Sequence, residues 1–255
     1  MKGLVCAGGN ATRLAELTRV TNKHLLPVGS WPMVYYPLQL LQRVGVREVL
    51  LVTGQQHAGQ FIDLLGNGRV ASRSGDDLLF DLDLSYKVQV EAGGIAQVVG
   101  MARDFAAGDK LVVCLGDNIF EHAQAGAIGA WDDDALVFAK DVPDPENFGV
   151  VAYGDDGEIA DIVEKAGVVD TRYDAPPSND AIVGLYCYPP DVFDIIDGLA
   201  PSNRGELEIT DVNRAYAKEG RLHVARVEGW WHDGGKHWGD LADVGRVIEQ
   251  TGANK

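Results

Sequence analysis

Three short apolar runs separated by helical patterns constrain the fold of this chain more than any other feature. Gly3–Ala7, Glu48–Thr53 and Lys110–Leu115 are rich in Val and Leu and are bounded by Gly, Asp or Asn, which is typical of buried strands. Helix-like spacing of apolar residues follows within 38–44 and 61–65, and 95–105 is a further helical segment. Strands that alternate with helices predict βαβ units and a mostly parallel sheet with helices on both faces.

The second half of the chain has a different pattern. Short strand candidates follow one another with few helices between them, at 135–139, 149–153, 158–163 and 181–188. Helices are expected at 210–218 and 237–250, and surface loops at 69–77 and 168–179. The predicted class is therefore α/β: a Rossmann-like three-layer sheet with an added, partly antiparallel region. We expect one domain over 1–255, in which 1–120 and 121–255 form two parts.

The charge of the chain excludes several kinds of partner. With 22 Lys and Arg against 38 Asp and Glu, the formal net charge is −16, so nucleic acid polymers and anionic membranes would repel it. Its three cysteines form no CxxC pair, which favours reduced thiols and a cytoplasmic protein. Cys6 and Cys114 lie in apolar runs and are expected to be buried. The acidic run at 132–134 is interpreted as a solvated loop.

The first strand leads directly into a glycine pair and an arginine. In the stretch 8–14, GGNATRL, the glycines allow backbone N–H groups to approach an anion, and Arg13 adds a guanidinium suited to phosphate. The stretch matches neither a Walker A loop nor GxGxxG. Taken alone, it fits a tight strand–loop turn without a ligand better than an anion-binding loop.

Motifs along nearly the whole chain resemble those of the sugar-1-phosphate nucleotidyltransferases, and most closely those of the short-form glucose-1-phosphate thymidylyltransferases. They occur in the family's order: KGLVCAGGNATRL (2–14), TNKHLLPVG (21–29), PMVYYPL (32–38), YKVQ (86–89), GGIAQ (93–97), LGDNIF (115–120), DPENFGV (144–150), VEK (163–165), GLYCY (184–188), RGELEITDVN (204–213) and GWWHDGGKH (229–237).

The resemblance implies a reaction between two anions. In this family a sugar 1-phosphate attacks the α-phosphorus of a nucleoside triphosphate, and pyrophosphate leaves. For this chain the resemblance implies dTTP and α-D-glucose 1-phosphate as substrates and dTDP-glucose as the product. Such chemistry needs neutralised charge and in-line positioning. The resemblance assigns catalytic roles to Arg13, Lys23 and Lys165, and it places Mg²⁺ on Asp117 and Asp233. A strand-end cap and an ordinary turn residue are the alternative interpretations of these two aspartates.

The resemblance also implies that 1–120 mainly binds the nucleotide and 121–255 mainly binds the sugar phosphate. The nucleotide-binding set is Gly8, Gly9, Asn10, Ala11, Thr12, Arg13, Gln89, Gly94 and Asp117, in which Gln89 and Gly94 would read the base. The sugar-phosphate set is Gly149, Glu164, Lys165, Val183 and Trp231, with either Glu206 or Glu208 as a further member. A homo-oligomer is usual among such proteins.

Four positions depart from the family pattern. Ala11 replaces a glycine, Glu16 and Ala166 each replace a proline, and Lys236 stands where threonine is usual. These changes bear on the choice of nucleotide and sugar. UTP or another triphosphate, or another sugar 1-phosphate, is therefore the alternative substrate prediction, and a non-catalytic nucleotide-sugar sensor is the alternative function. A zinc site at His232, Asp233 and His237 matches no strong zinc spacing.

Overall fold

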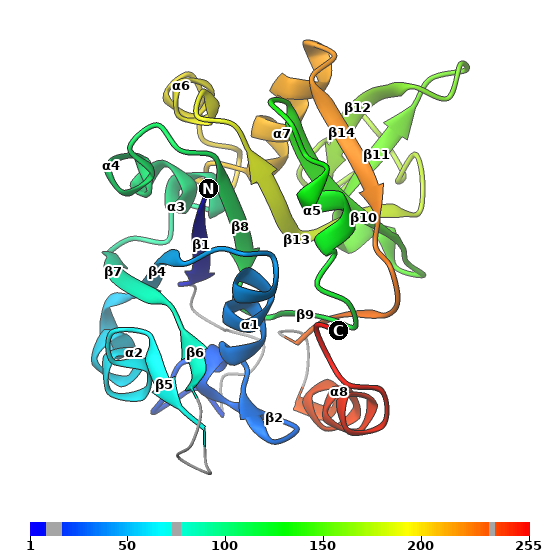
Figure 1. Ribbon diagram of the computed structural model, residues 1–255. Coiled ribbons are helices and arrows are strands. Elements are labelled where there is room, and N and C mark those ends of the chain that lie inside the picture. Colours follow the sequence, from blue (N-terminus) through cyan, green and yellow to red (C-terminus); the bar gives the residue numbers. More distant parts are fainter. Residues whose placement is uncertain (9–16, 73–77, 235–237) are drawn as a thin grey trace. The chain divides into compact units, whose positions relative to one another are not determined.

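The chain alternates between two structural units. The computed structural model describes residues 1–8, 17–72, 78–234 and 238–255 (Figure 1). Unit 1 comprises Met1–Ala92, Val112–Gly129 and Glu228–Lys255, and unit 2 comprises Gly93–Leu111 and Ala130–Val227. Each unit is therefore assembled from segments that are far apart in the sequence. The single domain expected from the sequence, with its division near residue 120, stays a prediction.

A parallel sheet forms the centre of unit 1. Its strands lie in the order β8 (Leu111–Leu115), β1 (Lys2–Ala7), β4 (Glu48–Gly54) and β7 (Asp83–Gln89). β1 pairs in parallel with β4, and β4 pairs in parallel with β7. The three apolar runs in the sequence thus became β1, β4 and β8, and the predicted α/β class with a mostly parallel sheet is confirmed.

Short helices and hairpins surround this sheet. Leu41 and Val46 fill the space beside Gly3 of β1, where a Cβ would lie 2.9 Å from Leu41 Cδ1. The other described elements of unit 1 are η2 (Lys23–Leu25), β2 (Pro27–Val28), β3 (Trp31–Pro32), α1 (Tyr35–Arg43), η3 (Gln55–His57), α2 (Ala58–Leu65), β5 (Arg69–Ala71), β6 (Leu78–Asp81), β9 (Asn118–Phe120), α5 (Ala125–Gly129), β15 (Trp231–Asp233) and α8 (Trp238–Thr251).

The loop expected at 69–77 is wrong in its first residues. Arg69–Ala71 forms β5, which pairs antiparallel with β6. This strand is mostly exposed, so no buried apolar face marked it in the sequence. The long helix expected at 95–105 is divided into α3 (Ile95–Met101) and α4 (Arg103–Ala106). The three cysteines are free and buried, as predicted for Cys6 and Cys114.

Unit 2 contains the partly antiparallel region. Its strands are β10 (Ala135–Asp141), β11 (Gly149–Tyr153), β12 (Ile159–Glu164), β13 (Asp180–Tyr188) and β14 (Leu222–Arg226). β11 pairs antiparallel with β12 and β13, and β10 pairs antiparallel with β13 but parallel with β14. Besides α3 and α4, its described helices are η4 (Pro145–Asn147), α6 (Val192–Asp197) and α7 (Ile209–Lys218). The predicted antiparallel addition is confirmed.

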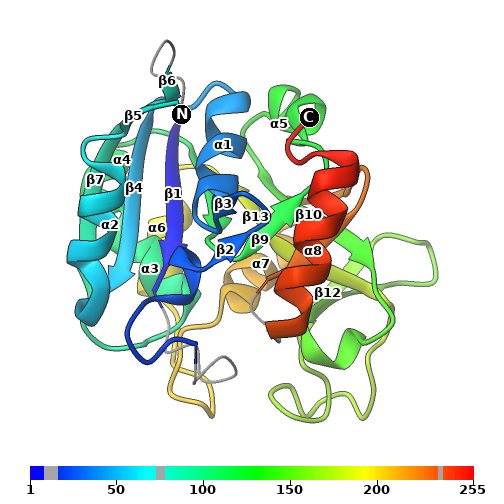
Figure 2. The same ribbon diagram turned by 90° about the horizontal axis from the view of Figure 1, so that it is seen from below.

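The long C-terminal helix of unit 1 packs closely against a short hairpin. α8 lies along β2 (Figure 2), and Leu241 and Val244 join Val28 and Met33 in one apolar cluster. Gly245 lets the helix backbone approach the hairpin turn, because a Cβ there would lie 2.8 Å from Gly29 N. Among the described residues, no helix is long and apolar enough to cross a membrane.

Gly245 provides a test of this close approach. Gly245→Ala is expected to lower the free energy of unfolding by about 1–3 kcal/mol, because the methyl group meets backbone that must move. Gly239→Ala on the same helix is the matched control, since none of the described atoms packed against the helix lies within 4 Å of a Cβ there, and alanine favours a helix over glycine. Chemical denaturation of both variants measures the difference. Equal stability of the two variants would contradict the packing of α8 on the hairpin.

Candidate active site

The carboxyl ends of the parallel strands bring several predicted site residues to one edge of the unit 1 sheet. Gly8 follows β1, Gly54 and Gln89 end β4 and β7, and Asp117 follows β8. A Cβ on Gly8 would lie 2.7 Å from Gln89 Oε1, so the glycine leaves room for this amide. Gln89 is buried. This edge is where open α/β sheets bind ligands, which supports a nucleotide site there.

An ion pair between Lys23 and Asp117 forms the charged centre of this edge. Lys23 Nζ donates a hydrogen bond to the Asp117 carboxylate, and both side chains are largely buried. Burial by itself would raise the pKa of Asp117, but the charge of Lys23 and the hydrogen bonds from Lys23 and Asn118 outweigh burial and lower this pKa below its usual range. The carboxylate is therefore ionised at neutral pH. The structure brings together a predicted catalytic cation and a predicted metal ligand that are 94 residues apart in the chain.

Buried polar contacts hold Lys23 in place. Asn22 caps the short helix η2, its side chain accepting a hydrogen bond from His24 N at 2.9 Å. The same side chain donates to Ala7 O at 3.2 Å, which ties the helix to the end of β1. Burial, with a smaller effect from Lys23, lowers the pKa of His24 to about 3, so this imidazole is neutral at pH 7. Lys23 thus projects from a turn that is anchored to the sheet.

Asp233 reaches this region through a strand pair that no local pattern indicated. β15 pairs antiparallel with β9, so that Asp233 lies opposite Asn118. Gly234 N donates to Asp117 O at 2.7 Å, which joins the two predicted metal-binding segments directly. Asn118 donates to Asp117 Oδ1 at 2.9 Å and accepts from Trp231 Nε1 at 2.7 Å. Asn118 is a positioning residue that we did not predict, although it adjoins Asp117 in the LGDN motif.

The donors present fit a divalent cation that prefers oxygen ligands. Asp117 supplies an ionised carboxylate. Asp233 lies opposite Asn118, the residue after Asp117, in the β9–β15 ladder. Among the residues that the structure describes, no group of three or more His, Cys, Asp or Glu could hold a metal ion by itself. Two carboxylates that leave the remaining positions to water and phosphate oxygens suit Mg²⁺. His237 of the alternative zinc site lies outside the described residues.

A second group of predicted site residues lies in unit 2, where β11 and β12 pair. Glu164 ends β12 and lies opposite Gly149 of β11. Thr210 of α7 donates a hydrogen bond to Glu164 Oε2, while Lys165 Nζ lies 3.5 Å from Oε1. A Cβ on Gly149 would lie 2.8 Å from Thr210 Oγ1 and 3.1 Å from Glu164 Oε2. The absence of a side chain at 149 therefore permits the hydrogen bond that orients Glu164.

Arg204 adds a cation that the sequence prediction missed. Its Nη2 lies 2.7 Å from Glu208 Oε2 and 3.8 Å from Glu164 Oε1. Ser202 also donates to Glu208, at 2.7 Å, so this carboxylate is used within the unit to hold Arg204. Glu206 is more exposed and lies 3.6 Å from Arg204. The RGELE motif contains both Arg204 and Glu208, but 204–208 is not helical, so their spacing of four residues did not by itself indicate that they pair.

The remaining predicted residues divide between the units and the undescribed segments. In unit 2, Val183 is buried in β13 and Gly94 packs against Leu207, where a Cβ would lie 2.3 Å from Leu207 O. Trp231 lies in unit 1. Several predicted residues lie outside the described part of the chain: Gly9, Asn10, Ala11, Thr12, Arg13, Glu16 and Lys236.

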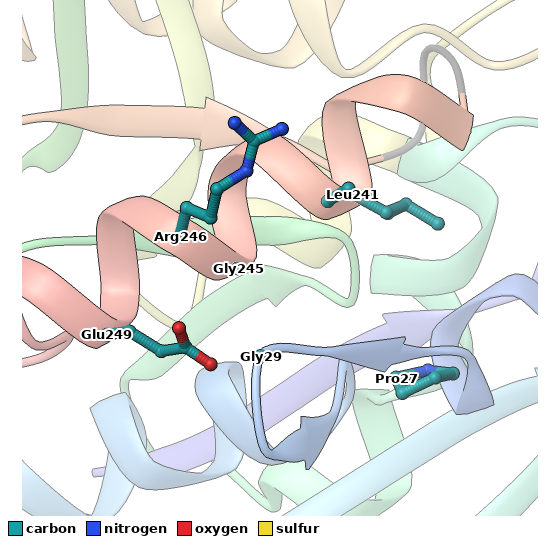
Figure 3. Close-up of a pocket in the computed structure, with 7 residues that line it drawn as sticks. Pro27, Gly29, Leu241, Gly245, Arg246 and Glu249 are labelled. Atoms are coloured by element: carbon teal, nitrogen blue, oxygen red, sulfur yellow. The ribbon is translucent and has the colours of Figure 1, made fainter.

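A small cavity lies elsewhere in unit 1, between the β2 turn and α8 (Figure 3). It has a volume of about 370 Å³. Glu249 points toward the hairpin that contains Pro27 and Gly29, and Arg246 points away from this hairpin (Figure 3). Its described lining includes none of the predicted site residues; it consists of Pro27, Gly29, Leu241, Ala242, Gly245, Arg246 and Glu249. We assign no step of the chemistry to this cavity.

Comparison with known proteins identifies the family. The model of the nucleotidyl transferase family matches residues 2–251. The chain belongs to this family. It is 38% identical over 254 residues to a glucose-1-phosphate thymidylyltransferase of Xanthomonas campestris pv. campestris, covering 97% of this chain and 80% of that protein. A protein of the same name from Mycobacterium tuberculosis is 36% identical over 257 residues, covering 98% and 84%.

Solved structures agree with this family. The crystal structure titled as a glucose-1-phosphate thymidylyltransferase from Bacillus anthracis, in complex with sucrose, has a TM-score of 0.84 and 38% identity, and covers 97% of this chain and 94% of that chain. A UDP-glucose pyrophosphorylase with UDP-glucose has a TM-score of 0.83 at 22% identity, covering 98% of each chain, and shows the fold. The resemblance inferred from the motifs is confirmed.

The Lys23–Asp117 pair leads to a test of its catalytic role. Asp117→Asn keeps the size of the side chain but removes its charge and replaces one acceptor oxygen with an NH2 donor, so we expect the rate of nucleotidyl transfer to fall by about 10²-fold or more. The matched control is Asp243→Asn, which alters an exposed carboxylate on α8 of the same unit and should leave the rate unchanged. Steady-state kinetics measures both variants, with circular dichroism to confirm folding. An unchanged rate in Asp117→Asn would refute the assignment.

Proposed function

We propose that this protein condenses dTTP with α-D-glucose 1-phosphate to give dTDP-glucose and pyrophosphate. The relatives' names support these substrates. The observation that carries the proposal is the pairing of a fixed cation with an ionised carboxylate at the end of β8, with a second cation and carboxylate at the end of β12. The Lys23–Asp117 pair fits the binding of the triphosphate, and the Lys165–Glu164 pair fits the binding of the sugar phosphate.

The chain's own side chains would perform charge neutralisation and positioning. Lys23 would contact the α-phosphate, and Arg13 would steady the β- and γ-phosphates and the departing pyrophosphate. The sugar phosphate oxygen attacks the α-phosphorus in line with the leaving group, so no covalent intermediate on the protein is required. The anchoring of η2 to β1 supports the role of Lys23, because a cation held before the reaction needs no reorganisation during it.

The resemblance assigns the base to Gln89 and Gly94, and the triphosphate to residues 8–13. The burial of Gln89 beside Gly8 supports this site, since a buried amide can read a base edge without competition from water. Asp117 and Asp233 would hold Mg²⁺. The ion would offset the negative charge that the two substrates bring together.

For the sugar phosphate, Lys165 would contact the phosphate and Glu164 would accept hydrogen bonds from sugar hydroxyls, with Gly149, Val183 and Trp231 lining the pocket. The hydrogen bond from Thr210 to Glu164 Oε2 supports this role, because it leaves Oε1 on the side of Lys165 and Arg204. A cytoplasmic homo-oligomer stays a prediction from the sequence and the resemblance.

A substrate panel tests the proposal. Pyrophosphate release is measured with dTTP, UTP, CTP, ATP and GTP, each with several sugar 1-phosphates and with Mg²⁺ or a chelator. We expect the highest kcat/KM for dTTP with glucose 1-phosphate, and loss of activity with the chelator. A preference for UTP or for another sugar would establish the alternative substrates instead. Folded protein that releases no pyrophosphate from any pair would favour a nucleotide-sugar sensor and refute the proposal.

Gly149 tests the sugar-phosphate site separately. In Gly149→Ala the added methyl group meets Thr210 Oγ1 and Glu164 Oε2 and displaces the carboxylate, so we expect KM for glucose 1-phosphate to rise about tenfold, equivalent to about 1.4 kcal/mol. KM for dTTP should change little. Gly198→Ala in the same unit is the control, because a Cβ there makes only an ordinary contact, 3.4 Å from Ile195 O. Equal changes in the two KM values would contradict this placement.

A further inference from the structure

Lys165 has a backbone conformation that residues with side chains rarely adopt. Its φ is 42°, in the left-handed region. Its N–H donates to Phe148 O at 3.0 Å, and its carbonyl accepts from the N–H groups of Val168 and Val169 at 3.0 Å each. A strained residue keeps such a conformation only where the surrounding structure enforces it. The direction of the Lys165 side chain therefore depends on whatever holds the turn that follows β12.

This turn returns to the strand at Asp170. The N–H of Asp170 donates to Glu164 O at 3.0 Å, and its carbonyl accepts from Gly167 N at 3.1 Å. Its carboxylate has a side-chain exposure of only 8%. Arg172 Nε donates to Asp170 Oδ1 at 2.9 Å, and Arg214 Nη2 donates to Oδ2 at 2.9 Å. The point at which the turn closes is thus held by two guanidinium groups.

Arg214 connects this closing point with β12 itself. The residue lies on α7, one helical turn after Thr210, and its side chain is 16% exposed. Its Nε donates to Asp161 Oδ1 at 2.9 Å, and its Nη2 donates to Ile162 O at 2.6 Å. Asp161 also accepts from Arg172 Nη1 at 2.8 Å. One guanidinium therefore binds the strand two residues before Glu164 and the turn five residues after Lys165.

We propose that Arg214 is a positioning residue for the sugar-phosphate site. Arg214 bonds to the Asp161 carboxylate, the Ile162 carbonyl oxygen and the Asp170 carboxylate. These contacts hold the turn in which Lys165 has its left-handed conformation, and so they set the direction of the Lys165 side chain. This inference rests on the proposed function, in which Lys165 contacts the sugar phosphate. The task suits arginine, because its planar group donates in several fixed directions and stays charged. Lysine offers a single point of attachment and would hold the strand or the turn, but not both in the same geometry.

The variants Arg214→Met and Arg214→Lys test this role by two independent measurements. The first is amide hydrogen exchange at Val168, Val169 and Asp170, whose N–H groups bond to Lys165 O and Glu164 O. The second is the KM for each substrate. In Arg214→Met we expect exchange at these amides to be at least about tenfold faster and KM for glucose 1-phosphate to rise about tenfold, with KM for dTTP within about twofold. Arg214→Lys should show a smaller change in the same direction and provides the test if Arg214→Met does not fold.

Arg221→Met is the matched control. Arg221 belongs to the same unit and also forms several ion pairs, with Asp134, Asp191 and Glu219. None of these described partners lies in the turn that follows β12. We expect its amide exchange at 168–170 and both KM values to match those of the wild type. A change equal to that in the Arg214 variants would show a general loss of unit 2 stability and would overturn the proposal.

Two further results would overturn it. Wild-type exchange at the three amides in a folded Arg214 variant would show that the arginine does not hold the turn. Faster exchange with an unchanged KM for glucose 1-phosphate would show that the turn does not position Lys165 for its substrate. A wild-type protein that releases no pyrophosphate from any substrate pair refutes the proposed function instead, and the exchange rates then still decide whether Arg214 holds the turn.

Discussion

The ion pair between Lys23 and Asp117 is the interaction around which unit 1 is organised. Two charges removed from water need each other and further hydrogen bonds, and loss of one partner of a buried pair costs about 3–5 kcal/mol. Here Asn118 donates a further hydrogen bond to the Asp117 carboxylate. Asn22 ties the turn that carries Lys23 to the end of β1. These contacts link the ends of β1 and β8, the η2 turn and the β9–β15 ladder. The charges that a phosphate or a metal would meet are therefore set before any ligand arrives.

The same principle reconciles the charge of the chain with anionic substrates. A net charge of −16 repels a phosphate at long range. At short range, individual fixed cations decide, since interactions in a partly buried site are screened less than those in water. Lys23 in unit 1, and Lys165 and Arg204 in unit 2, each lie beside a carboxylate that holds them in place. The acidic residues thus position the cations locally, although together they repel anions from afar.

Unit 2 uses its ion pairs in a different way. Arg214 and Arg172 each form ion pairs with both Asp161 and Asp170, which lie on either side of Lys165 in the sequence. Thr210, on the same helix as Arg214, orients Glu164. Helix α7 therefore supports both side chains that would contact the sugar phosphate. This explains why a strained backbone at Lys165 can persist at the end of an otherwise regular strand.

The sequence by itself determined the local elements and the kinds of chemistry available. The apolar runs that became β1, β4 and β8 and the helix that became α7 could be identified from it, because strand and helix periodicity are local properties. The motif residues Lys23, Asp117, Glu164 and Lys165 were identified through their resemblance to a known family. It did not indicate the β9–β15 pair that brings Asp233 to Asn118, the link between Arg214 and Asp170, or the contact of Arg204 with Glu164. Those contacts join residues 40 to 115 positions apart in the sequence. Only the tertiary structure decided them, because no local pattern specifies which distant strand or helix a side chain will meet.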